Sequence, residues 1–278
     1  MKILALNSLF IFSSITILAS ESTVIPTTTV KDQIKEKIFS AISGSAAVAI
    51  ALGAHNILEF MATYMHEHGH GIASRGDYSV TMIPLNNIAQ PWGGRATYSS
   101  NANPLLTTLA GPVAGIATTY IQTIALTMLK AYSKKKSLRT AFYKGLQFPI
   151  AFFANAMKTG KKYSTMLLKK ESLSPLKNKT LALSIDILLS LRMGRMIGES
   201  IYGLLPYKDP SELIVKAGGG DGEKIWKMLF GKQVPTFTGN LPAISLAILI
   251  APYVIGAIQG VYETIQEKQT AIDPAPPL

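Results

Sequence analysis

An apolar, helix-forming run that ends in a group of histidines constrains this chain more than any other stretch. Three of its four histidines lie between His66 and His70, directly after the run 57–65. Residues four apart share one face of an α-helix, so His66 and His70 can direct their ring nitrogens at one point. Imidazoles and a carboxylate in apolar surroundings are costly unless they are paired. The stretch therefore predicts a helix that presents a polar site inside a membrane.

The pattern H-E-x-x-H, formed by His66, Glu67 and His70, is typical of a zinc site. The two imidazoles can bind Zn²⁺, and Glu67 lies to the side, where it can deprotonate a water molecule. The chain has no cysteine, so any zinc must be held by histidine and carboxylate. We expect Zn²⁺ as the cofactor, His66 and His70 as metal ligands and Glu67 as the catalytic base. His68 is expected to point to the opposite face and to bind no metal.

The composition indicates a membrane protein. Charged residues make up 15% of the chain and hydrophobic residues 48%, whereas about a quarter of a soluble domain is charged. The net charge of +11 comes from basic residues beside apolar segments. This arrangement is typical of loops next to anionic lipid headgroups and argues against a nucleic-acid partner. We expect the lipid bilayer as a partner, and the sequence indicates no oligomeric state.

The order of segments predicts a mainly α fold, a polytopic bundle of transmembrane helices with a small β-hairpin or sheet. We expect a signal peptide or signal anchor over residues 1–20 and a polar spacer over 21–33. The membrane domain is predicted to cover 34–265, with a basic cytoplasmic tract at 132–180. Residues 266–278 are expected to form a disordered tail.

Residues 34–73 read as helix almost throughout, either as one long helix or as two helices that break near 53–56. If the helix is unbroken, His55 and Glu59 lie on the same stripe as the histidine pair, but too far along the axis to bind the same ion. The number of membrane crossings stays open, because a single crossing here would place the basic tract on the outer side.

The segment 76–100 has the turn residues and β-branched content of a hairpin, with strands near 78–83 and 95–98. Further apolar stretches follow at 104–131, 181–205 and 241–262.

Two details of these later segments carry expectations of their own. The short stretch 148–153 is predicted to be interfacial or re-entrant. In 181–205 we expect Arg192 or Arg195 to pair with Glu199 in the bundle interior.

Three pieces of this sequence, in order, resemble one protein family. His66–His70 resembles an H-E-x-G-H motif, Leu109–Pro112 an A-G-P segment, and Pro206 followed by Asp221-Gly222 an N-x-x-P and D-G element. These motifs are similar to those of the site-2-protease-like intramembrane zinc metallopeptidases, over roughly residues 50–230. The resemblance implies a zinc-dependent endopeptidase that hydrolyses peptide bonds of membrane protein substrates. It also implies an integral membrane protein, expected in the bacterial inner (cytoplasmic) membrane.

The resemblance further implies roles for residues outside the first motif. Asp221 would be the third zinc ligand, and the substrate-binding residues would be Asn103, Gly111 and Pro112. The chain departs from the family at Gly115, where the family usually has an asparagine.

Asn101 or Asn103 is left to supply the missing amide. The aspartate of the D-G element follows a glycine here instead of the usual leucine, so Asp186 and Asp209 stay open as alternatives to Asp221.

Two other classes of function also fit the sequence. One is a non-proteolytic membrane protein that binds zinc, either an inactive protease-like scaffold or a transporter. The other is a membrane-anchored structural protein in which the histidine motif arises by chance.

Overall fold

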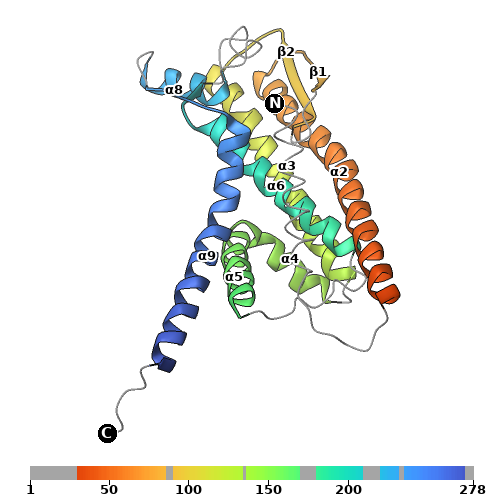
Figure 1. The fold of residues 1–278 in the computed structure, drawn as a ribbon. Coiled ribbons are helices and arrows are strands. Elements are labelled where there is room, and N and C mark those ends of the chain that lie inside the picture. The colour runs from red at the N-terminus through yellow and green to blue at the C-terminus, as the bar shows by residue number, and fades with distance from the viewer. Residues whose placement is uncertain are drawn as a thin grey trace. The chain divides into compact units, whose positions relative to one another are not determined.

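The computed structural model describes residues 30–85, 90–133, 136–169, 180–208, 220–231 and 235–272. The predicted signal segment and residues 21–29 of the predicted spacer lie outside this part. The predicted mainly α fold is confirmed for the described residues (Figure 1). The elements, in order, are α2 Val30–Ser74, β1 Tyr78–Pro84, β2 Trp92–Tyr98, α3 Pro104–Ser133, α4 Leu138–Leu146, α5 Phe148–Leu168, α6 Thr180–Leu204, β3 Tyr207–Lys208, α8 Asp221–Phe230, β4 Phe237–Thr238 and α9 Leu241–Ile272.

The chain divides into two compact units. One unit combines Ile50–Phe148 with Ile185–Ile248 and contains the histidine motif. The other combines Met1–Ala49, Pro149–Ser184 and Leu249–Leu278. The candidate site therefore depends on contacts within the first unit.

Helix α2 is a single helix from Val30 to Ser74. It begins inside the predicted spacer 21–33, and it runs without a break through 53–56, so the two-helix alternative is wrong. No proline interrupts the stretch, and a helix tolerates an isolated glycine at a cost of about 1 kcal/mol. Arg75 follows the helix with a φ of 59°, the left-handed conformation that commonly ends a helix.

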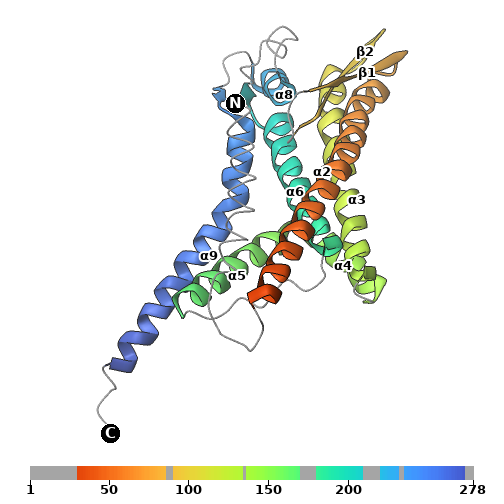
Figure 2. The same cartoon turned by 45° about the vertical axis from the view of Figure 1, so that its right-hand side comes forward.

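The predicted hairpin is confirmed: β1 and β2 pair antiparallel, from Tyr78 opposite Tyr98 to Pro84 opposite Trp92. It packs on α2, where the Trp92 indole nitrogen donates a 2.7 Å hydrogen bond to the Asn56 side chain. Figure 2 shows the hairpin beside the end of α2 that carries the histidines.

Helices α3 and α6 complete the core around α2. One cluster of buried apolar residues, contributed by the three helices, consists of Ala51, Leu126, Ile185, Leu188 and Leu189. Small residues bring the backbones close: a methyl group on Gly69 of α2 would overlap the Ala110 carbonyl of α3, and one on Gly203 of α6 would overlap Pro112.

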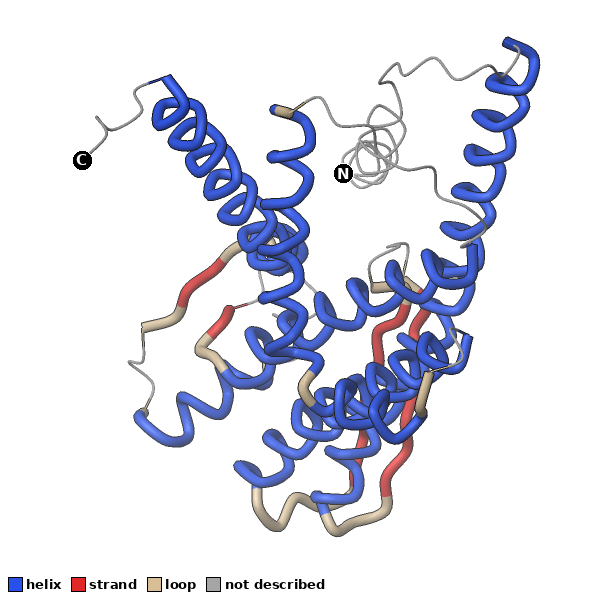
Figure 3. The backbone as a smooth tube through the Cα atoms, turned by 90° about the horizontal axis from the view of Figure 1, so that it is seen from below, coloured by secondary structure: helices blue, strands red, loops and turns tan. Residues whose placement is uncertain are grey.

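Helix α8 is held at the end of α6. A methyl group on Gly222 would overlap the Leu205 carbonyl, so the first turn of α8 lies directly against the backbone that follows α6. The two-residue strands β3 and β4 pair in parallel nearby, a sheet that the sequence did not predict (Figure 3). These contacts determine where Asp221, the first residue of α8, lies.

The apolar stretch 148–153, predicted to be interfacial or re-entrant, begins α5, which continues to Leu168. Its position relative to a membrane stays a prediction. The predicted tail, in the other unit, needs correction. Helix α9 continues to Ile272, into the range predicted as a disordered tail, while residues 273–278 lie outside the described part. Lys161 of α5 pairs with Glu263 of α9, and Lys169, the residue after α5, pairs with Glu267.

Within the described part of the chain, three helical segments are long and apolar enough to cross a membrane, namely Gly44–Ser74, Pro104–Ser133 and Ala243–Glu267. These segments support a membrane protein. Helix α6 has charged residues within its apolar sequence.

Candidate metal centre

Two histidines of α2 and one aspartate of α8 bring three ligand atoms together. Nε2 of His66 lies 3.1 Å from Nε2 of His70. Oδ2 of Asp221 lies 3.1 Å from the first of these nitrogens and 3.3 Å from the second. In a tetrahedral zinc site with bonds of about 2.0–2.1 Å, neighbouring ligand atoms are roughly 3.3 Å apart. The three atoms therefore match one face of a zinc tetrahedron and leave the fourth corner free for another ligand.

The partners of the other ring nitrogens orient both imidazoles. Nδ1 of His70 lies 2.7 Å from the carbonyl oxygen of Thr107. A carbonyl oxygen only accepts, so Nδ1 carries the hydrogen and Nε2 of the neutral ring presents its lone pair. Nδ1 of His66 contacts a carboxylate oxygen of Glu199 at 2.5 Å, an acceptor of the same kind. Both rings are thus held in the form that binds a metal through Nε2.

All three side chains are shielded from solvent, with 6%, 9% and 8% of His66, His70 and Asp221 exposed. Burial alone would raise the pKa of Asp221, but the contacts of its carboxylate with the two histidines outweigh that effect and lower the pKa. The carboxylate form that binds cations is therefore the favoured form.

The two alternative aspartates do not join this group within the described residues. Asp186 is half-exposed on α6 and pairs with Lys130 of α3. Asp209 lies outside the described part of the chain.

Glu67, the predicted catalytic base, is buried beside its neighbour His66. It lies under strand β2: a methyl group on Gly94 would come within 2.9 Å of its Oε1. The hairpin therefore covers the side of the histidine pair on which Glu67 lies, and only a glycine fits at that point of β2.

Of the predicted substrate-binding residues, Gly111 and Pro112 lie in the packing around the histidines. A methyl group on Gly111 would overlap the His70 ring. Pro112 is buried and packs against Gly203. The Asn103 side chain caps α3 instead, accepting a 3.0 Å hydrogen bond from the Leu106 backbone. Here the structure assigns a local structural contact to a residue for which the resemblance implied a role in substrate binding.

The surroundings of Gly115 leave little space for a side chain. A side-chain carbon there would lie 3.2 Å from the carboxylate of Glu199 and 3.3 Å from Nδ1 of His66. Glu199 thus occupies the space beside Gly115. Asn101, the other residue considered for a missing amide, instead accepts a hydrogen bond from the Thr107 hydroxyl at 2.8 Å.

Sequence reasoning missed the roles of Thr107 and Glu199. It correctly placed Glu199 in a pair with an arginine, since Arg195 contacts it at 2.7 Å. It also correctly placed His55 and Glu59 on the buried stripe of α2. Their partner is Arg192 of α6, which is itself fully buried. The only indication of the contact between Glu199 and His66 in the sequence is the presence of charged residues within the apolar stretch 181–205.

Comparison of the chain with protein-family models, with curated proteins and with solved structures found no match. Its function is therefore inferred from the arrangement of its own residues.

Proposed function

We propose that this protein is a zinc-dependent endopeptidase embedded in a membrane, which hydrolyses peptide bonds of membrane protein substrates. The observation that carries the proposal is the triangle of Nε2, Nε2 and Oδ2 atoms of His66, His70 and Asp221, with sides of 3.1–3.3 Å. The resemblance to the site-2-protease-like family points to the same three residues.

Zinc held by these residues would polarise the scissile carbonyl and acidify a water molecule. The Glu67 carboxylate would accept the proton of the attacking water and deliver it to the leaving amine nitrogen. Burial of Glu67 supports this role, because a shielded carboxylate beside the ligands can exchange a proton without competition from solvent.

The hairpin offers a way to position a peptide. Among the described residues it is a two-stranded sheet, so each strand has an edge that no other strand covers. A substrate added as a further strand would be held extended by main-chain hydrogen bonds. The contact between Gly94 of β2 and Glu67 places that sheet next to the proposed base.

We propose that the protein lies in the bacterial cytoplasmic membrane. The basic tract at 132–180 supports an orientation with this tract on the cytoplasmic side.

The second candidate is a membrane protein that binds zinc without proteolysis. One observation favours it: Asn103 and Asn101 are engaged with α3, and Glu199 fills the space beside Gly115. The amide that the resemblance expects beside the ligands has no counterpart among these residues.

Two variants separate the candidates. Full-length protein in detergent is assayed for zinc content and, in vesicles, for cleavage of a panel of tagged single-span membrane proteins. Under the peptidase proposal, wild type binds one zinc per chain and cleaves, His70→Ala loses zinc, and Glu67→Gln keeps zinc but loses cleavage. Zinc binding without cleavage by wild type would favour the second candidate. Zinc content that is equal in wild type and His70→Ala would contradict both.

A further inference from the structure

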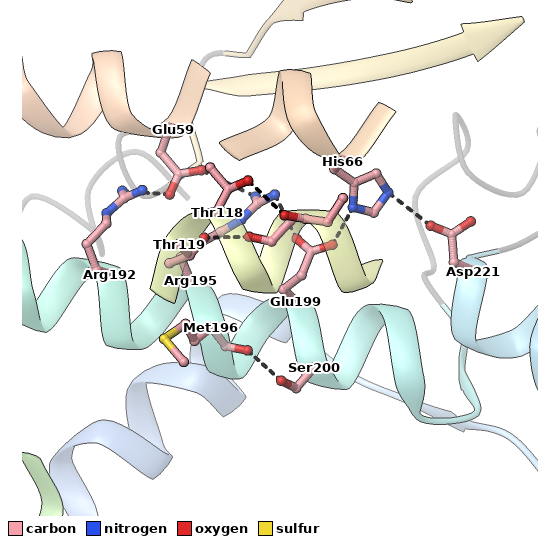
Figure 4. A network of polar contacts seen from close by, with 12 residues as sticks. Glu59, His66, Thr118, Thr119, Arg192, Arg195, Met196, Glu199, Ser200 and Asp221 are labelled. Atoms are coloured by element: carbon pink, nitrogen blue, oxygen red, sulfur yellow. Dashed lines mark hydrogen bonds and ion pairs between the residues drawn. The ribbon is translucent and has the colours of Figure 1, made fainter. Parts of the chain in front are cut away.

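A continuous chain of buried charges leads away from His66. Glu199 uses one oxygen for Nδ1 of His66, at 2.5 Å, and the other for Arg195, at 2.7 Å. Arg195 also reaches Oε2 of Glu59 at 3.3 Å, and Oε1 of Glu59 contacts Arg192 at 2.7 Å. Figure 4 shows this order between helices α2 and α6.

The spacing of these residues makes the chain of contacts possible. Glu59 and His66 are seven residues apart on α2, and Arg192 and Glu199 are seven apart on α6. Seven residues are close to two helical turns, so each pair lies on one face. The contacts advance in the same direction along both helices, and Arg195 lies between the two carboxylates.

The degree of burial is unusual for such groups. Glu59 and Arg192 are fully buried, and 5% of Glu199 is exposed. Buried charges cost free energy unless they are paired, and a well-packed apolar pair would often be at least as stable. Stability alone therefore does not explain these four buried side chains. A role for the Glu199 carboxylate at Nδ1 of His66, with the other three side chains holding it in place, explains them.

We propose that Glu199, Arg195 and Glu59 are positioning residues that act through His66 and determine how tightly the centre binds its metal. The proposal rests on the metal site of the proposed function. Glu199 accepts the hydrogen of Nδ1, which leaves Nε2 free for the ion and makes the ring a stronger donor. Arg195 holds the Glu199 carboxylate in place and balances its charge, and Glu59, backed by Arg192, does the same for Arg195.

The surroundings of Gly115 support this role independently. Because Gly115 has no side chain, Glu199 and His66 have room for their contact. A methyl group on Gly115 would lie 3.2 Å from the Glu199 carboxylate and 3.3 Å from Nδ1 of His66, closer than most such contacts. The packing of α3 thus accommodates that contact.

The test measures zinc affinity by competition with a chromophoric chelator, using the full chain in detergent. Glu199→Gln removes the charge but keeps the shape of the side chain. Its zinc dissociation constant is expected to rise about 10–100-fold, the usual effect of losing such a partner. Asp186→Asn, the same chemical change on the same helix in a pair outside the centre, is expected to leave the constant unchanged.

Two further measurements separate positioning from folding. The absorption spectrum of the Co²⁺-loaded protein is expected to change in Glu199→Gln, because the orientation of the His66 ring changes, and to stay as in wild type in Asp186→Asn. Gly115→Ala, which leaves every charge in place, is expected to weaken zinc binding in the same direction. It serves as the deciding variant if Glu199→Gln unfolds.

The outcomes are distinct. Wild-type zinc binding with an unchanged affinity and cobalt spectrum in Glu199→Gln would overturn the positioning role and leave the metal site intact. Wild type that binds no zinc would overturn the metal site itself, and the positioning role with it.

Discussion

Two helix–helix contacts in this protein are both made by glycine residues, but their surroundings differ. Around the candidate centre, Gly69 and Gly111 bring α2 and α3 together. In the other unit, Gly160 and Gly256 bring α5 and α9 equally close. A line of buried charges between α2 and α6 accompanies the first contact. The charged pairs beside the second contact, such as Lys161 with Glu263, are about 40% exposed.

The difference shows that close helix packing is not by itself a sign of a functional site. Small residues let backbones approach wherever two apolar helices must pack. Charges that are buried and paired across helices carry the functional signal, because their burial has a cost that packing does not require. Four substitutions, in order of expected effect, test this comparison.

The largest loss of stability is expected for Arg192→Met. Arg192 is fully buried against Glu59, and removing one partner of a buried pair costs about 3–5 kcal/mol. Denaturant unfolding of the purified protein in detergent measures this loss. A loss no greater than that of Lys161→Met would show that the buried pair is no more important than an exposed one.

Gly111→Ala is expected to damage both stability and metal binding. Its methyl group would overlap the His70 ring, and overpacking of this kind costs about 1–3 kcal/mol. Displacement of the ring moves Nε2 away from the other two ligand atoms, so zinc affinity falls as well. The chelator competition assay, run beside the unfolding experiment, checks both effects.

Gly256→Ala is the matched substitution in the second contact. Its methyl group would overlap the Met157 carbonyl, so a similar loss of about 1–3 kcal/mol is expected. Zinc affinity should stay at the wild-type value, because no ligand lies in that contact. Weakened zinc binding in this variant would contradict the separation of the two contacts.

The smallest effect is expected for Lys161→Met. The pair of Lys161 with Glu263 is about 40% exposed on both sides, and solvent screening leaves such pairs little effect on stability. The same unfolding assay measures the loss of stability. A loss above that of Gly256→Ala would contradict the small contribution expected of an exposed pair.

The parts of this fold that depend on neighbouring residues could be predicted from the sequence. The hairpin followed from its turn residues, and α2 followed from its apolar run without proline. The ends of elements were less predictable: α2 begins earlier and α9 ends later than expected. Helix ends depend on tertiary contacts, which local propensity does not contain.

In the candidate centre, too, the local features could be predicted from the sequence and the contacts between distant residues could not. That His66, Glu67 and His70 act together follows from a spacing of one helical turn, which any α-helix would realise. The choice among Asp186, Asp209 and Asp221 did not follow, because it depends on how α8 packs at the end of α6. The role of Glu199 did not follow either, since it lies 133 residues from its partner His66.

The sequence by itself determined a membrane-type helix that carries two histidines and a glutamate on adjoining faces, because helical periodicity is a local property. Only the tertiary structure decided that Asp221 completes a group of three ligand atoms. It also decided that Glu199 contacts His66 and is linked through Arg195 to Glu59. The physical reason is that these contacts join separate helices, whose approach is determined by glycine packing and by the pairing of buried charges.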